Sequence, residues 1–127
     1  MGCCSAGTGS TAMKTLIILN DPPYGTERTY NGLRLASALA KTGGEITLFM
    51  LGDSVVSAKR DQRTPEGFYN IEKMLKRVLA GGGVVLLCGT CMDARGIAAS
   101  ELIAGAQRSD MGALADATAA ADKVLVF

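Results

Sequence analysis

Two closely spaced cysteines, Cys88 and Cys91, are the residues of this chain best suited to covalent chemistry. They bound the string CGTC, which begins at the end of an apolar run at residues 84–88. Backbone N–H groups in the first turn of a helix, together with the helix dipole, stabilise a thiolate and lower the pKa of a cysteine there. If a helix begins near Met92, Cys91 lies at or beside its N-terminal cap. We therefore expect Cys91 to be the catalytic thiol.

The neighbours of these cysteines modify that expectation. Arg95 follows Cys91 by one helical turn and adds a positive charge that favours a thiolate, while Asp93 opposes it. Cys88 ends the apolar run, where a free cysteine often serves as a small buried hydrophobic side chain. A zinc site needs four ligands, so it would have to recruit carboxylates or the two N-terminal cysteines. We expect no metal and no other cofactor.

The chain contains no histidine, the commonest general base and metal ligand. Mechanisms that pair serine or cysteine with histidine are therefore excluded for this chain. The string CGTC resembles the redox motif of thioredoxins. Thioredoxin-like domains, however, place a cis-proline beside that motif from a later loop, and no proline follows Pro65. Thiol–disulfide exchange by Cys88 and Cys91 stays an alternative that rests on a local likeness.

Five short apolar runs predict strands, because each is too short for a helix and is bounded by turn residues. They lie at residues 15–19, 46–51, 84–88, 103–107 and 123–127. Apolar spacing and capping residues predict helices between them. These lie at about 26–41, 65–80 and 111–120, with shorter turns near 52–56 and 98–102. The alternation predicts an α/β fold, a three-layer α/β/α sandwich with a mostly parallel sheet of about five strands.

The first twelve residues, MGCCSAGTGSTA, are small and polar and show no apolar periodicity. We expect a disordered leader at 1–12 and a single domain at 13–127. The start MGCC resembles a lipidation signal, but Ala6 stands where the pattern requires serine or threonine. The string GTGSTA resembles a dinucleotide fingerprint, yet it precedes the first strand instead of following it.

Charge is balanced, with 13 basic and 12 acidic residues and no run of one sign. This balance argues against direct binding of nucleic acid or of an anionic membrane. No apolar stretch reaches the length of a membrane-spanning helix, and the N-terminus lacks the apolar region of a signal peptide. Cysteines paired so closely in sequence cannot staple distant parts of a fold, so a secreted disulfide scaffold is not expected. We expect a cytoplasmic protein.

Open parallel sheets bind ligands at the carboxyl ends of their strands, where the strand-to-helix loops converge. Two such loops stand out: NDPPYG after the first strand and GTCMDAR after the third. Because we expect the first strand to be central, we predict that Asn20, Tyr24, Gly25 and Gly89 border a substrate pocket beside Cys91. A plain proline-rich turn with a helix cap explains the first loop equally well.

Three segments together resemble the DsrE family of small sulfur-relay proteins, with its DsrE/DsrF-like and TusD/YchN-type members. They are NDPPYG after the opening strand, CMDARG after the third strand and the closing ADKVLVF. The likeness spans residues 13–127 and implies a doubly wound parallel sheet, a homo-oligomer of three or six subunits, and sulfur donor and acceptor proteins as partners. It also maps the persulfide-carrying cysteine onto Cys91, with Arg95 beside it as a substrate-binding residue.

These observations favour a sulfur carrier or sulfurtransferase that takes up sulfane sulfur as a persulfide on Cys91 and relays it to a partner protein. A thiolate that attacks a persulfide needs a low pKa and access, not a histidine base. Cys88 departs from the family pattern, since a second thiol so close could resolve the persulfide as a disulfide. Two alternatives stay open: a thiol–disulfide oxidoreductase that uses both cysteines, and a non-enzymatic oligomeric module that binds a small ligand.

Overall fold

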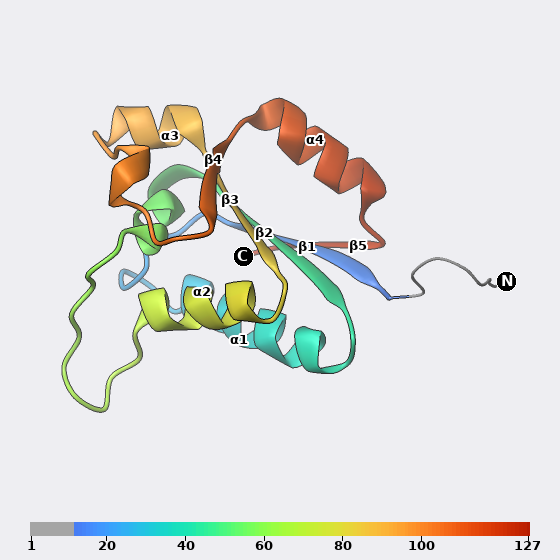
Figure 1. The fold of residues 1–127 in the computed structure, drawn as a ribbon, viewed down its shortest axis with the longest axis horizontal. Coiled ribbons are helices and arrows are strands. Elements are labelled where there is room, and N and C mark those ends of the chain that lie inside the picture. Colours follow the sequence, from blue (N-terminus) through green and yellow to red (C-terminus); the bar gives the residue numbers. More distant parts are fainter. Residues whose placement is uncertain (1–11) are drawn as a thin grey trace, which may run out of the picture.

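The structure, a computed structural model, describes residues 12–127. Three features of the N-terminus lie outside the described residues: the start that resembles a lipidation signal, all but the last residue of the string GTGSTA, and nearly all of the predicted leader. Five parallel strands form one sheet in the order β4-β3-β2-β1-β5 (Figure 1). This confirms the predicted α/β fold with a parallel sheet of five strands.

The elements follow one another in simple alternation. The strands are β1 (Lys14–Leu19), β2 (Glu45–Met50), β3 (Val84–Cys88), β4 (Ala106–Ser109) and β5 (Lys123–Val126). The helices are α1 (Arg28–Lys41), α2 (Ile71–Ala80), α3 (Gly89–Ala94) and α4 (Met111–Ala120), with two 3-10 helices, η2 (Gly52–Ala58) and η3 (Ala99–Glu101). Within residues 12–127, no helix combines the length and the apolar character needed to cross a membrane.

Helices cover both faces of the sheet. Figure 1 shows α1 and α2 side by side below it and α4 above it. Because η2 directly follows β2 and α3 directly follows β3, these two elements lie together at the carboxyl ends of the strands. The strand order corrects one expectation: β2 is the central strand, and β1 lies between β2 and β5. The sheet changes its winding direction between β1 and β5, which is the switch point of a doubly wound sheet.

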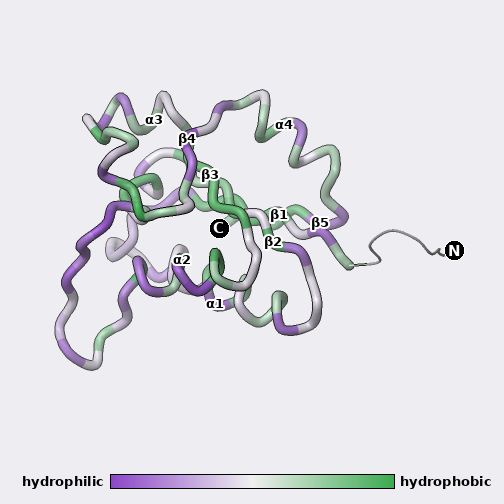
Figure 2. Tube along the Cα trace, in the orientation of Figure 1, coloured by the Kyte–Doolittle hydropathy of each residue, from purple (hydrophilic) through white to green (hydrophobic). Residues whose placement is uncertain are grey.

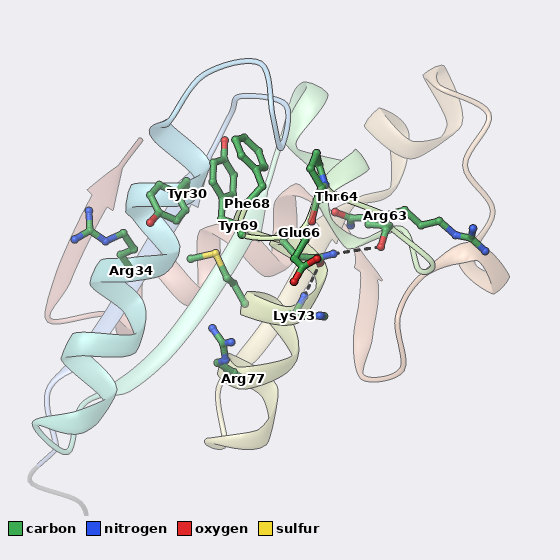
Figure 3. Close-up of a pocket in the computed structure, with 14 residues that line it drawn as sticks. Tyr30, Arg34, Arg63, Thr64, Glu66, Phe68, Tyr69, Lys73 and Arg77 are labelled. Carbon is green, nitrogen blue, oxygen red and sulfur yellow. Dashed lines mark hydrogen bonds between the residues drawn. The ribbon is translucent and has the colours of Figure 1, made fainter.

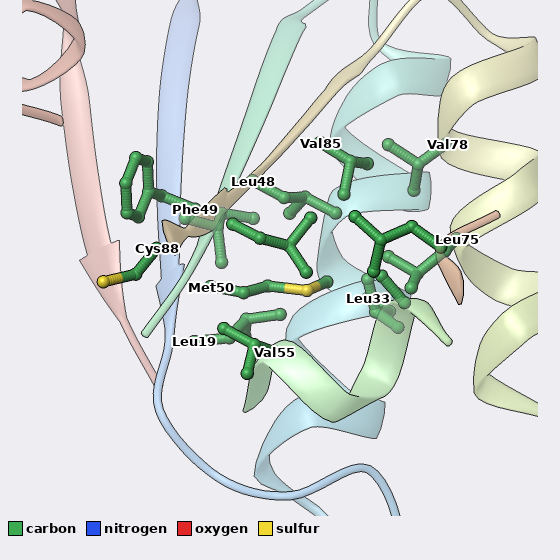
Figure 4. Close-up of a cluster of buried hydrophobic side chains, with 14 of the residues drawn as sticks. Leu19, Leu33, Leu48, Phe49, Met50, Val55, Leu75, Val78, Val85 and Cys88 are labelled. Atoms are coloured by element: carbon green, nitrogen blue, oxygen red, sulfur yellow. The ribbon is translucent and has the colours of Figure 1, made fainter. Parts of the chain in front are cut away.

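The main core lies between the sheet and the layer of α1 and α2. Leu48 and Val85, register neighbours on β2 and β3, are fully buried and cluster with Leu75 of α2. Side chains alternate between the two faces of a strand, and Figure 4 shows Phe49 and Cys88 projecting away from this cluster. Figure 2 shows apolar residues along the strands and polar residues along the loop between η2 and α2. Cys88 therefore faces the side of the sheet that α4 covers.

The helix α2 begins at Ile71, later than predicted. Asn70 is its N-terminal cap, and its side chain accepts a hydrogen bond from an amide of the first turn at 3.1 Å. Gly67 has a φ of +82°, a left-handed conformation that interrupts a helix. The apolar spacing that suggested an earlier start includes Phe68, whose ring stacks on another aromatic ring in the loop. A side chain held there does not face the core.

Other boundaries are closer to prediction. β3 and α4 begin and end where predicted. β4 covers Ala106–Ser109 rather than residues 103–107. Its predicted start was too early because Ile103 is buried in the core, where its amide donates a hydrogen bond to the Ala58 carbonyl oxygen at 2.9 Å.

Candidate functional site

The two predicted site cysteines lie where β3 passes into α3. This helix begins at Gly89, earlier than the predicted start near Met92, and the extended backbone of Cys88 makes that residue the N-terminal cap. Cys91 consequently lies in the first turn, close to the free N–H groups of that end. The neighbouring η2, which follows β2, supplies the other wall of the site.

The sulfur of Cys91 has a backbone donor. Cys91 is half-buried, and the Gly52 N–H donates a hydrogen bond to its Sγ at 3.2 Å. The preceding amide, that of Leu51, still belongs to the sheet and donates to the Leu19 carbonyl oxygen at 2.9 Å. Gly52 then turns the chain with a φ of +56°, which glycine adopts without steric cost. A donor to the sulfur favours its thiolate form.

The second thiol is more enclosed. Cys88 is only 7% exposed, and its Sγ lies 3.2 Å from the Thr90 Oγ1, a hydrogen bond in which either atom can donate. It also interacts with the Cys91 thiol. The two sulfurs therefore form one unit at the start of α3.

Because they interact, the two thiols titrate as a pair. Burial raises the pKa of the Cys88 thiol, but hydrogen bonds from Cys91 and Thr90 outweigh burial and hold that pKa below its usual value. The hydrogen bond with Cys88 and, next, burial raise the pKa of the Cys91 thiol, while the Gly52 N–H and Arg95 oppose the rise. The expected fall in the Cys91 pKa is therefore wrong for the reduced pair, because the S–H of Cys91 stabilises the thiolate on its partner.

Arg95 joins α3 to η2. Its Nε and Nη2 lie 2.9 Å and 2.8 Å from Oδ1 of Asp53, and its Nη1 donates to the Cys91 carbonyl oxygen at 3.0 Å. The structure thus gives this predicted substrate-binding residue protein partners on both sides. Its side chain links the first turn of α3 to η2, and its charge favours a thiolate on Cys91.

Arg108 belongs to β4, and its guanidinium packs against Gly89. The register of β3 and β4 pairs Cys88 with Ser109, which brings the arginine beside the start of α3. Its guanidinium donates two hydrogen bonds to Asp93, at 2.7 Å and 2.8 Å. A Cβ at Gly89 would lie 2.8 Å from the guanidinium carbon, so glycine allows this close approach. A cavity of about 440 Å³ opens here, lined by Cys88, Thr90, Arg108, Asp110 and Met111 among others.

Only part of the loop after β1 borders the thiol site. The backbone and side-chain amides of Asn20 both donate to the carbonyl oxygen of the last residue, at 3.2 Å and 3.1 Å, and the Asn20 carbonyl lies beside Gly52. Tyr24 belongs to a separate aromatic cluster, where its ring stacks on Tyr69. Gly25 packs against a proline of its own loop. Asn20 thus borders the thiol site, whereas Tyr24 contributes to a different surface.

The structure gathers Cys88 and Cys91 with Gly89 and Arg95 at the start of α3. Sequence reasoning misses Gly52, Asp53, Thr90 and Arg108. A signal exists for the first two, because they follow the second strand, whose carboxyl end lies at the same sheet edge as that of the third. No local signal marks Arg108, because its position depends on the pairing of β3 with β4.

The donor set of the site suits sulfur chemistry. It offers two interacting thiols, a backbone N–H aimed at one of them, and a guanidinium close by. Across residues 12–127, no group of three or more cysteine, aspartate or glutamate side chains is placed to hold a metal ion. The arrangement can form, hold and release bonds between sulfur atoms.

Comparison with known proteins places the chain in a family. The sequence profile of the DsrE/DsrF-like family matches residues 13–127. The chain belongs to this family. This DsrE/DsrF-like protein is 42% identical over 116 residues to protein YchN of Escherichia coli strain K12, across 90% of this chain and 98% of YchN. It is 36% identical over 115 residues to an uncharacterized protein of Methanocaldococcus jannaschii, across 91% of this chain and 100% of that protein.

Solved structures agree with the assignment. The crystal structure of the YchN protein from E. coli matches with a TM-score of 0.86 at 42% identity, over 91% of this chain and 99% of that one. A protein of unknown function from Methanobacterium thermoautotrophicum matches with a TM-score of 0.69 at 13% identity, over 91% and 99% of the two chains. The second likeness shows a shared fold alone. The family resemblance drawn from the sequence is confirmed.

Proposed function

We propose that this DsrE/DsrF-like protein carries sulfane sulfur as a persulfide on Cys91 and passes it from a donor protein to an acceptor protein. The observation that supports this most directly is the setting of the Cys91 sulfur. It is half-buried at a helix start and accepts the Gly52 N–H at 3.2 Å. A sulfur held this way can be reached by a partner, while its charge is stabilised by the backbone. Family membership supports the same sulfur-relay role.

The loading step needs no external oxidant or reductant. A Cys91 thiolate attacks the outer sulfur of a donor persulfide, so that a new S–S bond forms on Cys91 and the donor's S–S bond breaks. The donor leaves as a thiolate. In the resting pair Cys88 carries the charge and Cys91 the remaining proton, so this proton passes to Cys88 as Cys91 attacks. Transfer to the acceptor repeats the same exchange in the opposite direction.

We further propose that the protein acts as a homo-oligomer of three or six copies. Several large apolar side chains stay exposed outside the core, among them Val84 of β3, Met111 of α4, and Val124 and Val126 of β5. Val126 is 66% exposed at the end of an edge strand. Exposed apolar area of this kind is characteristic of a surface that another subunit covers.

Intact-mass measurement after treatment with a sulfane donor tests the carrier function. The reduced protein is incubated with an inorganic polysulfide and then desalted. We expect a gain of one sulfur atom that dithiothreitol removes, that is kept in Cys88→Ser and that is lost in Cys91→Ser. Because Cys3 and Cys4 are also thiols, every variant is made in a background in which both are serine. A gain that persists in Cys91→Ser, or no reducible gain in the background protein, contradicts the proposal.

The interaction between the two thiols favours thiol–disulfide exchange as a second candidate function. Cys88 at the cap and Cys91 in the first turn lie close enough to interact. In this reaction the two thiols are oxidised to one disulfide while a substrate disulfide is reduced to two thiols. Incubation with glutathione disulfide should then remove two hydrogen atoms from the protein mass, with peptide mapping to a Cys88–Cys91 bond. If only mixed disulfides with glutathione form, this second function is wrong.

A further inference from the structure

A second cavity, remote in sequence from the cysteines, lies between α1, α2 and the loop that precedes α2. Its volume is about 840 Å³, within the range of small-molecule sites. Figure 3 shows Tyr30 of α1 beside Phe68 and Tyr69 of the loop, with Lys73 and Arg77 of α2 along another wall. Both cysteines lie outside its lining, so its chemistry is separate from sulfur transfer.

One wall is a stack of aromatic rings. The centroids of Tyr30 and Tyr69 lie 4.2 Å apart with an interplanar angle of 26°, and those of Phe68 and Tyr69 lie 4.5 Å apart at 24°. Tyr69 thus stacks on both rings, and Tyr24 also stacks on it at a centroid distance of 5.7 Å. Phe68 is 52% exposed. A large apolar ring left half in water inside a cavity offers a flat surface for a further ring.

The other walls are cationic. Arg34, Lys73 and Arg77 line the cavity, and the described part of the chain gives none of them an ion pair with a carboxylate. The guanidinium of Arg34 lies 5.5 Å from the Tyr30 ring centroid. Arg63 also belongs to the lining, but Figure 3 shows its side chain extending away from the rings. Glu66 is the one carboxylate among the lining residues of this cavity.

The loop that carries the rings is held by hydrogen bonds. The Gln62 N–H donates to Glu72 Oε1 at 2.7 Å, and the Gln62 side chain donates to the Ser57 carbonyl oxygen at 2.7 Å. The Tyr24 hydroxyl accepts from the Ile71 N–H at 3.1 Å and donates to the Gln62 side chain. A loop fixed at both ends presents its rings in a set position, which lowers the cost of ordering them on a ligand.

We propose that this cavity binds a small organic anion that carries a planar ring, the chemistry of a nucleoside monophosphate. The ring stacks on the open face of Phe68, and the anionic group lies beside Lys73 and Arg77. Stacking alone would accept any flat apolar molecule, and the cations alone would accept any anion. The coincidence of both in one cavity selects ligands that have both parts.

Titration calorimetry on the full chain with adenosine 5′-monophosphate tests this proposal. Adenosine supplies the ring without the anion, and inorganic phosphate supplies the anion without the ring. We expect the monophosphate to bind at least about tenfold more tightly than either part. No heat at millimolar monophosphate, or equal affinity for all three ligands, overturns the proposal.

Substitutions locate the site. Arg77→Gln, Lys73→Gln and Phe68→Ser should each weaken monophosphate binding about tenfold, whereas Lys41→Gln, at the far end of α1, should leave it unchanged. Binding that is unchanged in all three cavity variants overturns the proposal. If the wild-type protein binds no monophosphate and Phe68→Ser lowers the mass of the assembly in light scattering, the surface is a subunit contact and the proposal is wrong. Persulfide loading of Cys91 in Arg77→Gln is measured in parallel, so each function can fail without the other.

Discussion

Replacing Gly52 by alanine tests the geometry on which the thiol site depends. Gly52 has a φ of +56°, and a Cβ there would meet only the Asn20 carbonyl oxygen, at 3.6 Å. That distance is ordinary contact, so the cost is backbone strain and not a clash. A left-handed alanine costs about 1–2 kcal/mol. For a domain of this size we expect a fall in melting temperature of about 4–8 °C, because 1 kcal/mol corresponds to about 4 °C.

The same change should alter the reactivity of Cys91. Strain pushes the alanine toward negative φ, which turns its N–H away from Cys91 Sγ. Losing that donor raises the pKa of the Cys91 thiol, so the pH profile of its alkylation by iodoacetamide should move to higher pH. The melting temperature and the alkylation profile are both measured in a Cys88→Ser background, in which Cys91 is the only thiol at the site.

Gly43→Ala is the matched control. Gly43 also has a positive φ, of +90°, it follows α1, and a Cβ there would meet nothing within 4 Å. The control should lose stability as Gly52→Ala does, but its alkylation profile should match that of the background protein. If Gly52→Ala loses no stability, the left-handed turn is absent in solution. If both variants alkylate like the background protein, the Gly52 N–H does not tune the sulfur.

Three further predictions follow from buried or exposed groups. Glu72→Gln should lower the free energy of unfolding by about 1 kcal/mol at neutral pH, because the carboxylate is 7% exposed and accepts the Gln62 N–H at 2.7 Å. Burial raises the pKa of Glu72, but hydrogen bonds, first that of the Gln62 amide, hold the pKa below its usual value. Its stabilisation is therefore present above the unfolded-state pKa and is lost as the pH falls through the folded-state pKa, so urea unfolding curves of wild type and variant should converge in acid. The alkylation profile of Cys91 should move to lower pH in Cys88→Ala, and that of Cys88 to higher pH in Cys91→Ala, because each thiol loses its partner. Val126→Asp should reduce the mass of the assembly in light scattering, because a charge replaces an exposed apolar contact.

A specific experimental result would contradict each of these three predictions. For Glu72→Gln, the control variant is Glu66→Gln, since Glu66 is exposed in the loop. If the free energy of unfolding differs between wild type and Glu72→Gln as much at about pH 3 as at neutral pH, the carboxylate explanation is wrong. Alkylation profiles that move in the same direction in Cys88→Ala and Cys91→Ala contradict the coupled pair. An assembly mass that Val126→Asp leaves unchanged excludes β5 as a subunit contact.

Local patterns were sufficient for much of the fold. β3 and α4 begin and end where the sequence pattern predicts them, because a strand or helix bounded by turn residues is specified within a few residues. α2 was placed too early, because Phe68 fits helical spacing although its ring stacks on Tyr69. Periodicity alone does not show which apolar side chain has a partner outside the core.

The sequence by itself determined the two thiols, the strand-to-helix junction that carries them and the family, because the order of short elements and the thiols of CGTC are local properties. Only the tertiary structure decided what surrounds the sulfurs. Gly52 reaches Cys91 because β2 and β3 are neighbours in the sheet, and Arg108 reaches the start of α3 through the β3–β4 register. The division of charge between Cys88 and Cys91 follows from hydrogen bonds and burial, which arise when distant segments pack together and exclude water.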